Sequence, residues 1–207
     1  EPELIHKNPE IGIINGLYAT INGNGGIIPI QIFNNYSPTS DKFDIKLTGN
    51  QGDVMKESVQ CSLTTALNYI QNNLKKYKIK DFNKYLNENV KCGFHVHAPS
   101  TSTPKDGPSA GCAFTSAFIS RILNKKIKND IGMTGEIELT GKITKIGGLM
   151  FKLIGAKLAG VKKVFVPLEN KKDLDDIKKK NSKLIDKNFS VSTCENISEI
   201  IDEILIN

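Results

Sequence analysis

The stretch Thr103-Pro104-Lys105-Asp106-Gly107-Pro108-Ser109-Ala110-Gly111 is predicted to form a rigid loop that runs directly into a helix. Pro108 has the preset φ angle of a first helical residue. Asp106 is expected to accept hydrogen bonds from the free N–H groups of the first turn. Apolar residues then recur at helical spacing, so this helix is expected to bury one face. They are Ala110, Ala113, Phe114, Ala117, Phe118 and Ile122.

This arrangement puts Ser109 in the first turn of the predicted helix, at the positive end of the helix dipole and beside unpaired backbone donors. A nucleophile there would have an oxyanion-stabilising environment nearby. Two other interpretations stay open from the loop alone. Ser109 is either a capping hydroxyl, or part of a helix N-terminus that binds an anion or a nucleotide.

Lys152 lies in a second predicted helix, among Leu149, Phe151, Leu153 and Ile154. Burial there would lower the pKa of the lysine, and a lysine that is neutral near pH 7 can act as a general base. The alternative is a lysine whose stem lies along apolar surface while its ammonium group reaches water.

The composition fits a globular chain with one well-buried domain or two small lobes: 207 residues, 39% of them hydrophobic. No apolar run approaches the length of a membrane span, and the N-terminus lacks the features of a signal peptide. Four dispersed cysteines without a CxxC pair favour a reduced, intracellular setting, either cytoplasmic or in an organelle matrix.

The formal net charge is +6, and much of the basic excess lies in residues 161–187. Lysines scattered among acids usually form a solvated face. Arg121 is the one arginine and tryptophan is absent, which leaves few groups for contacts with bases. Nucleic acid is therefore not an expected partner.

Alternation of apolar residues and turn signals predict a series of strands, and apolar residues at helical spacing predict helices between them. The strand from residue 11 to 21 is expected to bend at Asn15-Gly16. Strands and helices intermix after a hairpin-rich first half, so the expected fold class is α+β with a mixed sheet. The other strands are expected over residues 27–33, 43–48, 92–98, 131–139, 143–146, 161–167 and 189–193, and the helices over 53–74, from 108 onward, and over 147–160, 171–180 and 197–204.

The serine motif (residues 104–111), Met133-Thr134-Gly135-Glu136, and Gly147-Gly148-Leu149 leading to Lys152 closely resemble the proteolytic domain of Lon proteases. The resemblance extends from about Gly16 to the terminal helix and includes residues 52–58 and 95–97. It implies the α+β fold of that domain over residues 11–207, with residues 1–10 as an N-terminal tail or the end of a linker.

The resemblance also implies a catalytic Ser–Lys dyad. Ser109 matches the nucleophile and Lys152 matches the base. Thr134 matches a threonine whose hydroxyl hydrogen-bonds the lysine, and Asp106 matches an acid beside the nucleophile that influences access and conformation. The implied activity is that of a serine endopeptidase which hydrolyses unfolded or damaged proteins through an acyl-enzyme.

Full-length Lon proteases carry an AAA+ ATPase module and work as hexameric rings, so the resemblance implies unfolded polypeptides, an AAA+ module and further copies of the chain as partners. ATP and Mg²⁺ would belong to that module, because no GxxxxGK[ST] motif occurs here and no cofactor is expected in this chain. Glu1 as the first residue suggests a piece of a longer protein. The alternative function is a catalytically idle Lon-like domain that serves as an assembly or substrate-docking ring.

Three positions depart from the family pattern. Met150 and Phe151 stand where charged residues are common, and Tyr18 replaces a tryptophan common near the first strand. His95 and His97 share one strand face, yet no third ligand is evident, so hydrogen bonding is preferred to metal binding and no metal site is expected. A Cys–His protease is discounted because no cysteine has a suitable motif around it.

Overall fold

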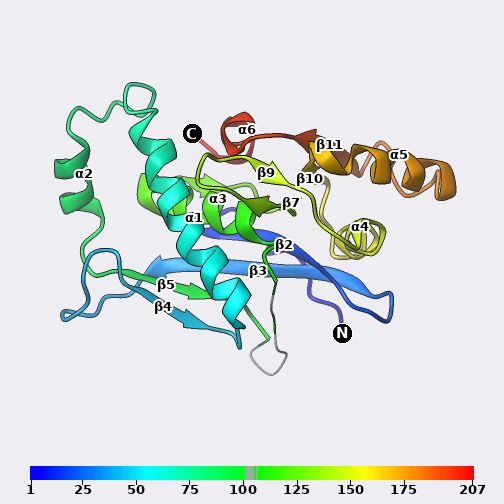
Figure 1. The fold of residues 1–207 in the computed structure, drawn as a ribbon, viewed down its shortest axis with the longest axis horizontal. Coiled ribbons are helices and arrows are strands. Elements are labelled where there is room, and N and C mark those ends of the chain that lie inside the picture. Colours follow the sequence, from blue (N-terminus) through cyan, green and yellow to red (C-terminus); the bar gives the residue numbers. More distant parts are fainter. Residues whose placement is uncertain (101–104, 106) are drawn as a thin grey trace.

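The computed structural model describes residues 1–100, 105 and 107–207, and its centre is a seven-stranded mixed sheet (Figure 1). The strand order is β11-β10-β7-β2-β3-β5-β4. The β2–β3 and β3–β5 pairs are antiparallel, and the other neighbours are parallel. The strands of this sheet are β2 (Ile13–Ala19), β3 (Gly25–Asn34), β4 (Ile45–Thr48), β5 (Phe94–His97), β7 (Ile131–Met133), β10 (Lys163–Pro167) and β11 (Ser190–Cys194).

Two small antiparallel pairs and the helices complete the fold, which confirms the predicted α+β class with mixed sheets. The pairs are β1 (Glu10–Ile11) with β6 (Lys126–Ile127), and β8 (Glu136–Ile137) with β9 (Ile143–Thr144). The helices are α1 (Asp53–Gln71), α2 (Phe82–Asn89), α3 (Gly111–Leu123), α4 (Leu149–Leu158), α5 (Lys171–Lys180) and α6 (Ile201–Ile204), with 3-10 turns η1 (Leu168–Asn170) and η2 (Ile197–Glu199).

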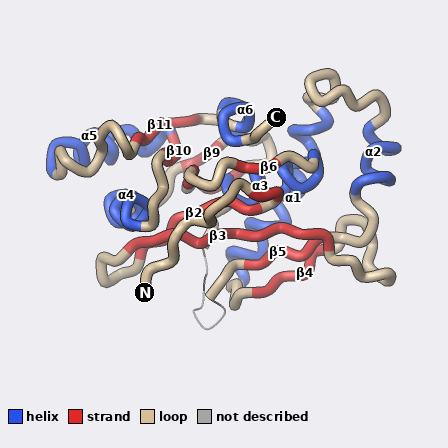
Figure 2. Tube along the Cα trace, turned by 180° about the vertical axis from the view of Figure 1, so that it is seen from behind, coloured by secondary structure: helices blue, strands red, loops and turns tan. Residues whose placement is uncertain are grey.

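The sheet is covered on both faces, so the molecule has two hydrophobic cores (Figures 1 and 2). The first core contains the apolar faces of α1 and α3, and the second contains those of α4 and α5. Strand β10 contributes to both, because successive side chains of a strand point to opposite faces. Its Phe165 lies in the first core, while Val164 and Val166 lie in the second.

Several predicted elements differ from the observed ones. The strand expected over residues 131–139 is divided into β7 and β8, because Thr134 N–H donates to Phe165 O (3.1 Å) and Gly135 N–H donates to Ser109 O (2.8 Å). The bend expected at Asn15-Gly16 lies instead at Gly12, and β2 runs straight through Asn15. Helix α1 ends at Gln71 rather than at residue 74, and the terminal helix is reduced to η2 and α6.

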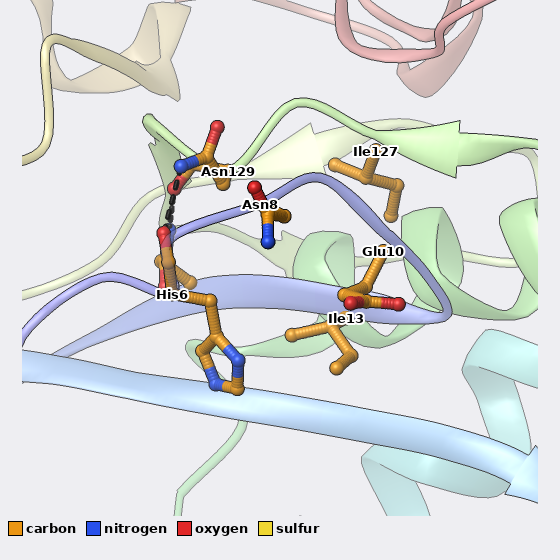
Figure 3. Close-up of a pocket in the computed structure, with 7 residues that line it drawn as sticks. His6, Asn8, Glu10, Ile13, Ile127 and Asn129 are labelled. Atoms are coloured by element: carbon orange, nitrogen blue, oxygen red, sulfur yellow. Dashed lines mark hydrogen bonds between the residues drawn. The ribbon is translucent and has the colours of Figure 1, made fainter.

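The first residues of the chain are held by specific contacts (Figure 3). Ile5 N–H donates to Ala159 O (3.1 Å), and Asn129 Nδ2 donates to His6 O (2.7 Å). Between this segment, β2 and β6 lies a cavity of about 10 Å³, which is room for about one water molecule.

Among the described residues, no helix has both the length and the apolar character that a bilayer span requires.

Candidate active site

Lys152 lies in the second turn of α4, and its side chain is buried rather than extended along the surface. Only 5% of the residue is exposed, and its neighbours Leu149 and Leu153 are buried too. Burial penalises the charged ammonium and lowers the pKa of Lys152 from 10.5 to about 8. A substantial fraction of this amine is therefore neutral near pH 8, which is what a general base requires.

Thr134 connects Lys152 to the serine turn. It lies in the break between β7 and β8 and is fully buried. Lys152 Nζ donates a hydrogen bond to Thr134 Oγ1 (3.4 Å), and Thr134 Oγ1 donates to the backbone carbonyl of Ser109 (3.4 Å). The threonine hydroxyl thus uses its acceptor for the lysine and its single proton for the serine backbone.

Ser109 lies in the turn that precedes α3, not in the first turn of the helix. The helix begins at Gly111, and Gly111 N–H donates to Pro108 O (3.1 Å) across this turn. Two further backbone hydrogen bonds fix the turn against the strand break: Gly135 N–H to Ser109 O (2.8 Å) and Cys112 N–H to Gly135 O (3.0 Å). Ser109 itself is partly exposed.

The structure brings Ser109, Thr134 and Lys152 together, with Thr134 as their shared partner. Within the described residues, no hydrogen bond joins the Ser109 hydroxyl to Lys152 Nζ. Asp106, the fourth predicted site residue, lies outside the described residues. Catalytic hydrogen bonds are often loose before substrate binds, so this arrangement is compatible with a Ser–Lys pair.

Cys112 is a neighbour of Lys152 that sequence reasoning missed. The thiol is buried in α3, and burial holds its pKa well above the ordinary value. Its electrostatic interaction with Lys152 acts in both directions, lowering the thiol pKa and raising that of the lysine. Its position three residues after Ser109 was the available signal, but only the fold brings it close enough to Lys152 for their charges to interact.

His95 and His97 share one hydroxyl partner. Thr48 Oγ1 lies 2.8 Å from His95 Nε2 and 2.7 Å from His97 Nδ1. Burial lowers the pKa of His95, and the charge of Lys46 lowers it further. In the part of the chain that the structure describes, no three histidine, cysteine or acidic side chains converge as a metal site would require.

Residues 1–207 match the family described as the Lon protease (S16) C-terminal proteolytic domain. The chain is 54% identical over 206 residues to a Lon protease homolog of Acanthamoeba polyphaga mimivirus, with 97% of this chain and 19% of that protein covered.

Two further relatives come from distant organisms. A Lon protease of Finegoldia magna is 40% identical, with 98% of this chain and 24% of that protein covered. A mitochondrial Lon protease homolog of Caenorhabditis briggsae is 41% identical, with 80% of this chain and 17% of that protein covered. The chain thus spans about a fifth of the length of these relatives. On the match over all 207 residues, the chain belongs to the Lon protease C-terminal proteolytic domain family.

Proposed function

We propose that this chain is a serine peptidase domain in which Ser109 is the nucleophile and Lys152 is the general base. The observation that carries the proposal is the buried lysine, whose pKa of about 8 accompanies a hydrogen-bonded connection through Thr134 to the serine turn. The membership of the chain in a protease family supports the same reaction class.

The reaction begins with neutral Lys152. Its Nζ takes the proton of the Ser109 hydroxyl while Ser109 Oγ forms a bond to the carbonyl carbon of the peptide. The tetrahedral intermediate collapses as the lysinium gives its proton to the leaving amine, and an ester on Ser109 remains. Lys152 then takes a proton from water, the hydroxide attacks the ester, and the lysinium returns the proton to Ser109 Oγ as the acid product leaves.

Backbone amides at the serine turn are suited to stabilise the oxyanion. The N–H groups of Gly111 and Cys112 are occupied by Pro108 O and Gly135 O. Within the described residues, the N–H groups of Ser109 and Ala110 donate to no acceptor. Two unoccupied donors beside the nucleophile are what an oxyanion hole requires, so we assign this role to Ser109 and Ala110.

The substrates and partners are part of the same proposal. The chain covers about a fifth of its relatives, so we infer that it acts within a longer protein. There it would cleave unfolded polypeptides, as one copy in a ring hexamer, with ATP and Mg²⁺ used by an AAA+ module elsewhere in that protein.

The test uses the full-length protein with a fluorescently labelled unfolded polypeptide and ATP. Ser109→Ala and Lys152→Ala are each expected to abolish hydrolysis while leaving the far-ultraviolet circular dichroism spectrum unchanged. A fluorophosphonate should label the parent protein at Ser109, located by peptide mapping. Full turnover in either variant would disprove the assignment of the dyad. A parent protein that neither hydrolyses peptide nor reacts at Ser109 would instead favour the idle domain.

A further inference from the structure

Two glycines allow α4 to lie directly on the backbone of β3. Gly25 begins β3, and Gly155 lies in the middle of α4. A Cβ atom built on Gly155 would lie 2.2 Å from the carbonyl carbon of Gly25 and 2.3 Å from the nitrogen of Gly26. Real Cβ atoms essentially never approach other heavy atoms to within 3.0 Å, so neither contact leaves room for a side chain. We call this contact the glycine seam.

The glycine seam touches the main chain of the candidate base. A Cβ atom on Gly25 would lie 1.9 Å from Phe151 O and 3.1 Å from Lys152 N. Gly25 therefore fits against the peptide bond that joins Phe151 to Lys152. All of these are backbone atoms, so no side-chain rotation can relieve a clash there. The position of the Lys152 backbone is fixed by the end of the β2–β3 hairpin.

Small displacements of α4 would affect the hydrogen bond between Lys152 and Thr134, because this bond is already long. Lys152 Nζ lies 3.4 Å from Thr134 Oγ1, and a movement of α4 away from β3 by the thickness of a methyl group would break this hydrogen bond. The same movement would admit water to the amine of a residue that is now only 5% exposed. Among the described titratable groups, Cys112 on α3 is the one whose charge state acts on this amine.

We propose that Gly25 and Gly155 are positioning residues, whose missing side chains hold α4 on β3 and so place Lys152 Nζ beside Thr134 and the serine turn. The inference rests on the proposed function, because it gives a geometric cause for the base that the reaction requires. A packing role alone would affect only stability, whereas the positioning role also predicts a change in the reactivity of the Lys152 amine.

Two substitutions test the seam, and a third glycine supplies the control. Gly25→Ala and Gly155→Ala each force a Cβ into the seam, whereas Gly147→Ala, just before α4, adds a Cβ with no atom within 4 Å. Gly155→Ala gains about 1 kcal/mol of helix propensity, which offsets part of the cost of its clash. All three are made in the full-length protein carrying Ser109→Ala, so that catalysis plays no part in the readout.

The measurement is the pH dependence of Lys152 acetylation by acetic anhydride, followed by peptide mapping. We expect a midpoint near pH 8 in the parent and in Gly147→Ala, and a midpoint at least one pH unit higher in Gly25→Ala and Gly155→Ala. With Ser109 restored, fluorophosphonate labelling at pH 8 should slow at least tenfold in the two seam variants and recover at higher pH.

Folded seam variants that keep both the parental midpoint and the parental labelling rate would overturn the positioning role. If the parent protein fails to react at Ser109, the proposed function is wrong. The acetylation midpoints would still decide whether the glycine seam sets the environment of Lys152.

Discussion

Lys152 is buried among leucines, and its amine donates a hydrogen bond to Thr134 Oγ1. Burial of an amine is unfavourable to its charged form, and this cost is what makes the group useful as a base. Thr134 compensates in part, because its hydroxyl accepts from the amine without supplying a charge. A carboxylate at the same place would raise the pKa of the lysine and keep it protonated.

The pH dependence of stability follows from the same residue. The folded pKa of about 8 lies below the ordinary 10.5, so between these values the unfolded chain binds more protons and the free energy of unfolding rises with pH. Below pH 8 the lysine is protonated in both the folded and the unfolded chain. The destabilisation caused by burying its charge is therefore complete and no longer changes with pH. Lys152→Met should therefore be more stable than the parent at pH 7, by up to roughly 3 kcal/mol. Urea unfolding from pH 7 to 10.5 should show this advantage shrinking, and an advantage independent of pH would contradict the assigned pKa.

The hydroxyl of Thr134 supports both the proposed base and the serine turn. Thr134→Val removes the hydroxyl but keeps the shape, so Lys152 loses its acceptor and the serine turn loses one hydrogen bond. We expect kcat/KM for peptide hydrolysis to fall about 100-fold, at the low end of what a positioned proton-transfer group contributes, because Thr134 orients the proposed base and does not transfer the proton itself. Thr134→Ser keeps the hydroxyl and serves as the matched control. Equal activity in the valine and serine variants would exclude a role for the hydroxyl.

Among the elements, α3 and the first strand segment are joined by side chains at the end of the helix far from Ser109. Arg121 Nε donates to Ile32 O (2.8 Å), and its Nη2 donates to Ile11 O (3.0 Å). Ser120 Oγ accepts from Gly12 N–H (2.9 Å). These bonds satisfy backbone groups where the bend at Gly12 interrupts regular pairing. They also hold the N-terminal segment to the helix that follows the candidate nucleophile.

Removal of the guanidinium should loosen this junction. Arg121→Met leaves two backbone carbonyls without their donor, and we expect the free energy of unfolding to fall by about 1–3 kcal/mol. Amide exchange at residues 10–12 should become faster, while exchange in α1 changes only through global stability. Lys125→Met, at an exposed contact with Asn207, is the control and should change stability by less than about 0.5 kcal/mol. Unchanged exchange at residues 10–12 would show that Arg121 does not hold this segment.

In the whole molecule, the proposed nucleophile and the proposed base belong to different cores. Helix α3, which follows Ser109, packs into the first core, and α4 with Lys152 packs into the second. Thr134 lies in the break between β7 and β8 and bonds to residues from both sides. The relative placement of the two cores therefore determines whether the candidate site is assembled.

A substitution that creates a cavity in the second core should disturb Lys152, the proposed base, more than it disturbs the serine turn. Leu153 is fully buried, and Leu153→Ala is expected to cost about 2–5 kcal/mol in the free energy of unfolding. Acetylation of Lys152 should become faster at a denaturant concentration where amides of α3 still resist exchange. Leu158→Ala, on the same helix at a residue that is 72% exposed, is the control. Simultaneous loss of protection in both cores would show that they open as one unit.

The sequence predicts local features of this fold better than distant ones. The apolar spacing of α1 and the alternation of β5 identify both elements because their signals lie within a few residues. The division of residues 131–139 at Thr134 was not predictable, since it depends on bonds to Phe165 and Ser109. The start of α3 was misplaced for a similar reason, because the turn at Ser109 is held by Gly135.

The candidate site shows the same limit. Its residue types follow from the resemblance and its chemistry from the apolar surroundings of Lys152. The electrostatic interaction with Cys112 depends on the tertiary fold, which brings α3 and α4 to the same site from two different cores. The exposure of Lys152 could not be decided from the sequence either. A lysine beside leucines is equally compatible with a surface stem, and only the packing of α4 on β3 excludes that.

The single arginine of the chain has a practical consequence. An endoproteinase that cuts only after arginine has one target within residues 1–207, in a helix whose remaining residues are buried. Cleavage there divides the polypeptide so that Ser109 and Lys152 fall on separate fragments. The fraction of cleaved protein, measured by mass spectrometry, would thus report the fraction of molecules in which α3 has unfolded. If Ser109 and Lys152 act together, these are also the molecules that are expected to lose activity.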